Sequence, residues 1–195
     1  NDTVEWSGSI EGYAFADCIS LTEVQLAGSY KELGSYLFSG CTSLKNLTIP
    51  EGVTSLGYYM IRGTAISSIT VPSTVTSSGY YVSSGSYNGA LAGCTTLKEV
   101  IFAQGATVIP AYICASNSQT SYIEKIVIPD SVTSIGNYAF YKCASLREGV
   151  NIPRNTRTIG YSAFQGCTSL TEVTMNYNDT VEWSGSIEGY AFADC

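Results

Sequence analysis

The sequence contains no histidine, and only 13% of its residues are charged. Without histidine, neither a Ser-His-Asp nor a Cys-His nucleophile can form, and the most common metal-binding side chain is missing. The cysteines form no Cys-x-x-Cys pair, so a zinc site is not expected either. We therefore predict a protein that is not an enzyme, with no catalytic residue, no cofactor and no metal.

Positive charge is also scarce. Lys and Arg number 9 against 16 Asp and Glu, which gives a net charge of −7 without any basic cluster. This balance opposes binding to nucleic acid and to anionic membranes. No apolar run approaches the roughly 18 residues of a spanning helix, so we expect no membrane insertion of this portion. The abundant Ser, Thr, Gly and Tyr form a neutral, hydroxyl-rich surface, which favours an extracellular or cell-surface location.

Repetition is what the sequence does contain. An apolar residue opens a similar segment about every 23 residues, a period typical of a solenoid: Leu21, Leu44, Ile66, Leu97, Ile123, Leu146 and Leu170. Each segment has the form L-x-x-V-x-I, whose last two apolar residues alternate with polar ones, as in a strand with one buried face. Proline follows several of these segments, as at Pro50 and Pro129, and ends strand pairing there.

Two shorter motifs complete each repeat. The stretch V-T-S-I-G at Val132 to Gly136 is nearly repeated at Val53 to Gly57, and its glycine is expected to adopt a backbone angle that other residues resist. The motif Y-A-F at Tyr138 to Phe140 has relatives throughout the chain. We predict a short 3₁₀ or helical turn there, with the phenylalanine pointing inward.

These residues carry a family resemblance. The pattern I-P-x-x-V-T-S-I-G-x-Y-A-F-x-x-C-x-S-L-x-x-V, clearest at Ile128 to Leu146 and Ile152 to Leu170, resembles the leucine-rich repeat of BspA-like surface proteins of bacteria and some protozoa. The resemblance implies a curved leucine-rich-repeat solenoid with a parallel β-sheet on one face. With the turn prediction above, we expect about seven to eight rungs carrying 3₁₀ or helical turns and loops on the other face. The resemblance also implies a non-enzymatic role in adhesion, carried by no fixed residue motif.

The cysteines follow the repeat. Cys195 repeats Cys18, and five of the remaining six hold one repeat position, whereas Cys114 stands where the repeat expects phenylalanine. Equivalent residues on adjacent rungs lie about 4.8 Å apart, close to disulfide range, but their parallel Cβ directions fit a disulfide poorly. We predict buried reduced thiols, with occasional disulfides between neighbouring rungs as the alternative.

Glutamates also recur, just before the central residue of several strand segments, at Glu23, Glu99, Glu148 and Glu172. We interpret them as a solvated face rather than as a catalytic carboxylate pair, because such a pair requires a dry, deep site.

Three stretches break the repeat: Tyr58 to Gly63, Tyr80 to Gly89 and Ser116 to Tyr122. The second contains an eight-residue insertion, Val82 to Gly89, and insertions in repeat proteins tend to carry specificity. Tyrosine with Ser and Gly is also the composition of adaptable recognition loops. The candidate partner-binding residues are therefore Tyr58, Tyr59, Tyr80, Tyr81, Ser83, Tyr87, Asn88 and Tyr122. A plain surface loop is the alternative, and the protein or cell-surface ligand is not specified by the sequence.

A second level of repetition is present, because residues 178–195 are identical to residues 1–18. We therefore expect residues 1–195 to form one continuous solenoid that is an excerpt of a longer tandem array with a 177-residue block. Two functions follow. The first is an adhesin-like protein that binds other proteins or cells, and the second is a structural filament or stalk of tandem blocks, with self-association into rods.

Overall fold

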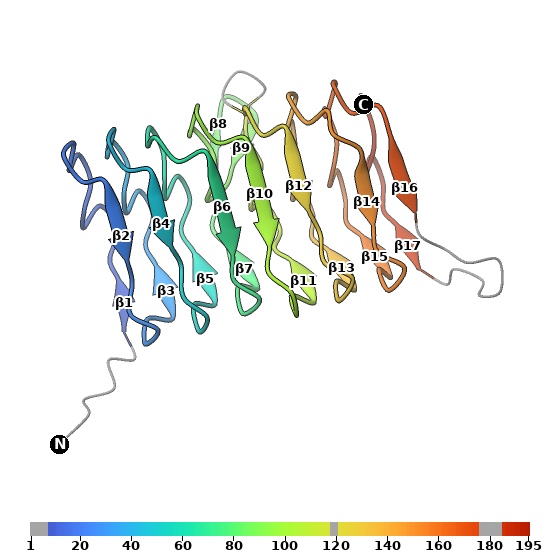
Figure 1. The fold of residues 1–195 in the computed structure, drawn as a ribbon. Coiled ribbons are helices and arrows are strands. Elements are labelled where there is room, and N and C mark those ends of the chain that lie inside the picture. Colours follow the sequence, from blue (N-terminus) through green and yellow to red (C-terminus); the bar gives the residue numbers. More distant parts are fainter. Residues whose placement is uncertain (1–7, 118–120, 176–184) are drawn as a thin grey trace.

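A computed structural model describes residues 8–117, 121–175 and 185–195. The chain winds into a solenoid whose short strands lie side by side in two rows (Figure 1). The first row forms at the L-x-x-V-x-I segments, as predicted: β2 (Glu23–Gln25), β4 (Asn46–Thr48), β6 (Ser68–Val71), β10 (Glu99–Phe102), β12 (Lys125–Val127), β14 (Val150–Ile152) and β16 (Val173–Met175). Hydrogen-bonded neighbours in this row are parallel, and the register joins equivalent repeat positions such as Val100 and Ile126.

The second row was not predicted. It forms mainly at the V-T-S-I-G motif and its relatives: β1 (Ser9–Ile10), β3 (Glu32–Leu33), β5 (Ser55–Leu56), β7 (Ser77–Ser78), β11 (Val108–Ile109), β13 (Ser134–Ile135), β15 (Thr158–Ile159) and β17 (Ser186–Ile187). These strands also pair in parallel, in two four-stranded sheets that are separated between β7 and β11. Each rung therefore contributes one strand to each row, and the insertion of the fourth repeat falls at the break in the second row.

The prediction of a 3₁₀ or helical turn at Y-A-F is wrong, because the described residues contain no helix. Alternate backbone N–H groups in this stretch donate to the next rung, as Phe38 does to the carbonyl of Met60 at 2.8 Å, and the ones between close single turns, as Ser39 does to Tyr36 at 3.0 Å. The preceding tyrosine also adopts a positive φ, 58° at Tyr36 and 56° at Tyr138. Neither an engaged N–H nor a left-handed residue is compatible with a helical turn.

The glycine of the V-T-S-I-G motif was expected to adopt a backbone angle that other residues resist, and this expectation is also wrong. Gly136 lies outside the left-handed region, and the positive φ falls on Tyr138 two residues later. A Cβ at Gly136 would stand 2.5 Å from the backbone nitrogen of Ala111 and 2.8 Å from its Cα. Glycine is therefore required because the backbones of two rungs approach closely at this column.

Between the two rows, each repeat position forms a column of buried side chains. Phe140 and Phe164 are fully buried and stack with their ring centroids 5.0 Å apart, and the stack continues from Phe164 to Phe192 at 5.1 Å. Cys114 occupies the same column, since its N–H donates to the carbonyl of Ala139 just before Phe140. The solenoid core is therefore a set of ladders that run along the axis.

Every cysteine of the described residues is free, and five are buried as predicted, whereas Cys18 and Cys195 are exposed. Cys143 and Cys167 are fully buried, and their thiols donate to the carbonyls of Cys114 and Phe140 at 3.4 and 3.3 Å. Burial raises the pKa of Cys143 to about 12 and also raises the pKa of Cys114 and Cys167. These thiols act as small core residues with a weak donor.

Candidate partner-binding surface

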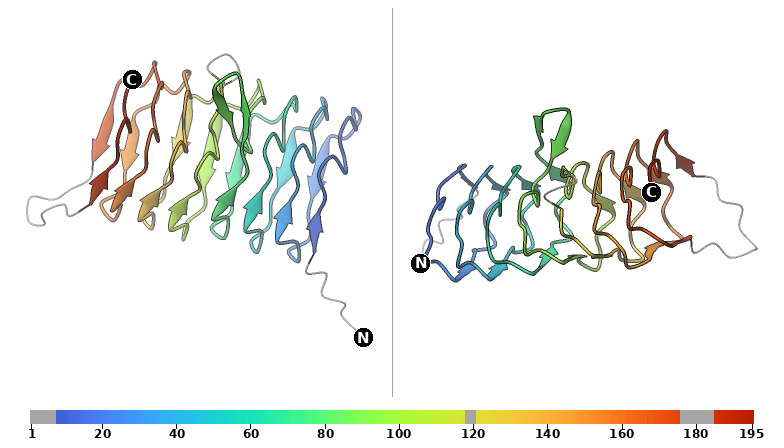
Figure 2. Two further views of the ribbon diagram at one scale, coloured as in Figure 1. Left: turned by 180° about the vertical axis from the view of Figure 1, so that it is seen from behind. Right: turned by 90° about the horizontal axis from the view of Figure 1, so that it is seen from above.

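The insertion of the fourth repeat folds into a β-hairpin. Its strands β8 (Tyr81–Ser83) and β9 (Ser86–Asn88) form the antiparallel pair of the described residues, and Figure 2 (right) shows them projecting from the body of the solenoid. The two turn residues, Ser84 and Gly85, have φ of 50° and 74°. Positive φ at both central positions is the type I′ geometry that matches the twist of a two-residue hairpin.

The two strands of the hairpin have different environments. Ser86 and Asn88 of β9 are buried, whereas all three residues of β8 are exposed. The side chain of Lys142 donates to the hydroxyl of Ser86 at 3.2 Å, and the N–H of Asn117 donates to Oδ1 of Asn88 at 3.3 Å. The inner strand is thus fastened to later rungs, and the outer strand faces solvent.

Tyrosine rings hold the hairpin from both sides. Tyr81 stacks on Tyr58 of the preceding rung with centroids 5.7 Å apart. On the other side, Tyr80 stacks on Tyr112 at 4.0 Å, and Tyr87 lies 4.5 Å from Tyr138. The hairpin therefore rests on aromatic contacts with rungs that come before and after it in the chain.

These contacts belong to a longer set that we name the tyrosine ridge, in which ring contacts link neighbouring rungs in two groups. The first group is Tyr13, Tyr36, Tyr58, Tyr59 and Tyr81, and the second is Tyr80, Tyr87, Tyr112, Tyr138, Tyr141, Tyr161 and Tyr190. Burial, and then neighbouring phenols, raise the pKa of Tyr112 and Tyr138. These two phenols are therefore neutral at physiological pH, and their hydroxyls can both donate and accept hydrogen bonds.

The structure places five of the predicted residues in two groups of ring contacts, Tyr58 and Tyr59 with Tyr81, and Tyr80 with Tyr87, and Ser83 is exposed on the strand that contains Tyr81. Two further predicted residues lie apart from these groups. Asn88 is fully buried, so its side chain fastens the hairpin and offers no outer surface. Tyr122 lies outside the ridge, with the Lys98 ammonium 5.5 Å from its ring centroid.

Sequence reasoning missed Val82, which is 51% exposed on the outer strand, and Lys142, which fastens the inner one. It also placed Tyr138 in the Y-A-F turn and did not single out Tyr112, although the rings of both lie against Tyr87. The recurrence of tyrosine at one repeat position was the available signal, because equivalent residues of a solenoid lie next to each other.

The glutamate column of the first row is paired in part. Lys125 reaches Glu99 at 3.2 Å and Glu148 at 3.7 Å. On the neighbouring column, the Glu124 carboxylate accepts a hydrogen bond from Lys98 at 2.8 Å and also contacts Arg147. The pKa of the Glu124 carboxyl is lowered, mainly by the hydrogen bond from Lys98. These groups alternate in sign on an exposed surface, and such pairs contribute little individually.

Comparison with known proteins identifies the repeat. The family model for the BspA type leucine-rich repeat region matches residues 8–147 and 116–195, with six copies. The chain belongs to this BspA-type family. No curated protein matches the sequence.

Solved structures resemble this BspA-type chain over most of its length. A leucine-rich repeat protein from Bacteroides ovatus is 25% identical, with a TM-score of 0.55 over 96% of this chain and 58% of that chain. The leucine-rich repeat protein of T. pallidum is 24% identical, with a TM-score of 0.50 over 85% of this chain and 62% of its own. This chain therefore spans less than two thirds of either structure, and the T. pallidum likeness concerns the fold alone.

Proposed function

We propose that this BspA-type repeat protein is non-enzymatic, acts outside the cell or at its surface, and binds other proteins or cells through the hairpin and the adjoining tyrosines. The observation that carries this proposal is the exposed outer strand β8, held at the break in the second row. Repeat-protein families are generally non-enzymatic, and the scaffold offers an extended surface.

The chemistry of this surface favours a protein partner. Tyr80, Tyr81 and Val82 are 47%, 46% and 51% exposed and are consecutive in the chain. Contiguous exposed apolar side chains mark interaction sites, and tyrosine is enriched among residues that dominate interface energies. Since the rings of Tyr80 and Tyr81 already stack on the solenoid, little side-chain entropy remains to be lost on binding.

The test compares two substitutions on opposite sides of the molecule. Val82→Asp places a carboxylate on the exposed hairpin strand, and Thr70→Asp places one on an exposed position of β6 in the first row. Binding is measured on a biosensor against a panel of purified extracellular-matrix proteins and against intact cells. We expect Val82→Asp to weaken binding at least tenfold, about 1.4 kcal/mol, and Thr70→Asp to bind as wild type. Equal binding by both variants would contradict the proposal.

A structural filament or stalk is the second candidate, favoured by the identity of residues 178–195 with residues 1–18. Seven rungs at about 4.8 Å advance the axis by about 34 Å. Electron microscopy of the protein should then show rods of constant width with an axial repeat near that value or a multiple of it. Isolated particles without rods would contradict this second role.

A further inference from the structure

The outer strand of the hairpin has one edge that pairs with β9 and one edge, which we name the free edge, that does not. The two-residue turn makes Ser83 and Ser86 the closing pair, which exchanges both of its backbone hydrogen bonds, and the next pair, Val82 with Tyr87, exchanges none. The N–H and the carbonyl of Val82 therefore point away from β9. The N–H of Tyr80, two residues earlier, also donates to no backbone acceptor in the described part of the chain.

The sequence of β8 does not protect the free edge from pairing with another molecule. Natural proteins protect such edges with a charged side chain, a proline or a bulge. The strand reads Tyr-Val-Ser, without charge or proline, and its register with β9 contains no bulge. All three residues are exposed, and the hairpin projects from the solenoid (Figure 2). The free edge is therefore accessible to an extended segment of another molecule.

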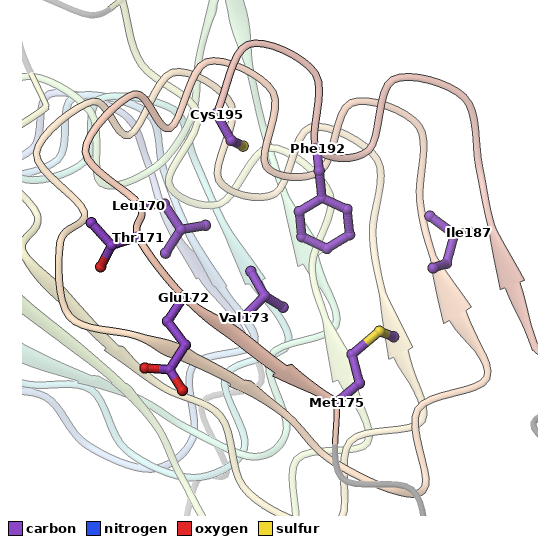
Figure 3. A pocket seen from close by; sticks show the side chains of 8 residues that line it. All are labelled: Leu170, Thr171, Glu172, Val173, Met175, Ile187, Phe192 and Cys195. Atoms are coloured by element: carbon purple, nitrogen blue, oxygen red, sulfur yellow. The ribbon is translucent and has the colours of Figure 1, made fainter.

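The charge around the hairpin differs from that of other parts of the molecule. The longest stretch of the sequence without Asp or Glu covers residues 52–98 and includes the whole hairpin, in a chain with a net charge of −7. Two cavities elsewhere carry carboxylates instead. One of about 360 Å³ beside β16 contains Glu172 (Figure 3), and one of about 280 Å³, lined by β1, β3 and β5, contains Glu11 and Glu32. An anionic partner is therefore least opposed at the hairpin.

Two cations flank the hairpin. Arg62 is exposed on the side of β8, with its guanidinium carbon 5.6 Å from the ring centroid of Tyr59, and the Tyr59 ring contacts Tyr81. On the side of β9, Lys142 donates to Ser86. Neither cation forms an ion pair with a carboxylate among the described residues, unlike Lys98 and the other cations of the first row that pair with glutamate. A carboxylate supplied by a partner would complete the environment of Arg62.

We propose that an extended acidic segment of the protein partner adds to the free edge of β8 as a further strand, with its backbone bonded to Val82 and a carboxylate beside Arg62. In this mode of recognition, main-chain hydrogen bonds supply affinity and side chains supply specificity. The inference rests on the proposed binding role of the hairpin and states the form of its partner. A second copy of this chain fits less well, because its hairpin would bring equal cations and no carboxylate from residues 52–98.

The first test removes the outward N–H alone. Val82→Pro deletes the donor on the free edge and retains the bonds between β8 and β9, since an edge strand accepts proline where its N–H faces solvent. Val82→Thr is the matched control, because threonine has a similar shape and keeps the N–H. The probe is a short fluorescent peptide of alternating Glu and Val with capped ends, and binding is measured by anisotropy. We expect Val82→Pro to bind about tenfold more weakly than wild type, and Val82→Thr to bind within about twofold of it.

The second test concerns charge. A peptide of alternating Lys and Val has the same strand pattern with the opposite charge, and we expect it to bind at least about tenfold more weakly than the acidic peptide. Arg62→Gln should weaken binding of the acidic peptide by about threefold and reduce its dependence on salt. Arg154→Gln, which removes the same charge from an exposed turn after β14, should bind as wild type.

Nuclear magnetic resonance of the wild-type protein tests the free edge without any variant. The peptide should slow hydrogen exchange of the Val82 amide at least about tenfold and leave the Ser83 amide, already bonded to β9, nearly unchanged. Slow exchange of the Ser83 amide in Val82→Pro verifies that the hairpin persists in that variant.

Four results would overturn strand addition: no binding of the acidic peptide, an unchanged Val82 amide in the bound state, equal binding by Val82→Pro and Val82→Thr, or equal binding of the two peptides. Protection of Val82 that grows with protein concentration in the absence of peptide would also overturn it, in favour of pairing between two copies. If Val82→Asp still abolishes binding to matrix proteins in any of these cases, the hairpin keeps its proposed function and only the strand form of the partner is removed.

Discussion

Replacing Gly136 by alanine tests whether close approach of neighbouring rungs, and not backbone flexibility, explains the motif glycine. The added Cβ would stand 2.5 and 2.8 Å from backbone atoms of Ala111 and 3.0 Å from the carbonyl oxygen of Ile109. Backbone on the adjacent rung cannot rotate away as a side chain can. The two rungs must therefore separate locally.

The energetic cost follows from the hydrogen bonds at that contact. The N–H of Gly136 donates to Ile109 at 2.9 Å, and the N–H of Tyr112 donates to Asn137 at 3.0 Å. Loss of these two bonds at about 1 kcal/mol each, with residual strain, predicts that Gly136→Ala lowers the free energy of unfolding by about 2–4 kcal/mol. Urea denaturation with linear extrapolation measures this change.

The control is Gly149→Ala, because a Cβ there would lie 3.4 Å from the Cβ of Glu172 and 3.7 Å from its carbonyl oxygen, within ordinary contact. Reduced freedom of the unfolded chain should leave this variant within about 1 kcal/mol of wild type. If Gly136→Ala costs no more than Gly149→Ala, the close-approach argument is refuted.

Three further predictions concern the core and the charged face. Ser162→Gly should raise the free energy of unfolding by about 1 kcal/mol in urea melts, since Ser162 has a φ of 53° and a buried hydroxyl without a partner in the described part of the chain. Thiols in the unfolded chain ionise above pH about 8.5, whereas the raised pKa values of Cys114, Cys143 and Cys167 keep them protonated in the fold. Stability should therefore fall as pH rises past that value, by up to about 1.4 kcal/mol per pH unit for each thiol, and less in a Cys114→Ala variant. Lys125→Met should leave the free energy of unfolding nearly unchanged and should remove part of the salt dependence of the melt, because both ion pairs of Lys125 are exposed to solvent.

Repeat spacing was sufficient to predict the first strand row and the core columns, because residues at one repeat position must stack on one another. It did not predict the second row, whose strands are only two residues long and in most cases contain Ser or Thr, as in Ser134–Ile135. The Y-A-F turn was mispredicted because backbone pairing between rungs overrides local helical preference, as at Phe38. Such pairing depends on the lateral distance between rungs, which no single repeat encodes.

The length of the insertion was enough to place the candidate site at the fourth repeat, but the sequence did not show which side chains of the insertion are exposed. Ser84 and Gly85, both with positive φ, fold the insertion into a hairpin. In this hairpin the side chain of Asn88 is buried and that of Val82 is exposed. Lys142, which fastens the hairpin, lies 56 residues after Ser86 in the chain. Contacts of this separation could not be inferred from a motif.

The most direct test of partner binding is hydrogen–deuterium exchange of the protein, free and bound to whichever matrix protein the biosensor identifies. The account predicts that protection on binding is concentrated in Tyr80–Asn88 and in the neighbouring tyrosines Tyr58 and Tyr59, with β6 and β10 of the first row unchanged. Protection of β6 and β10 with an unchanged hairpin would contradict the account.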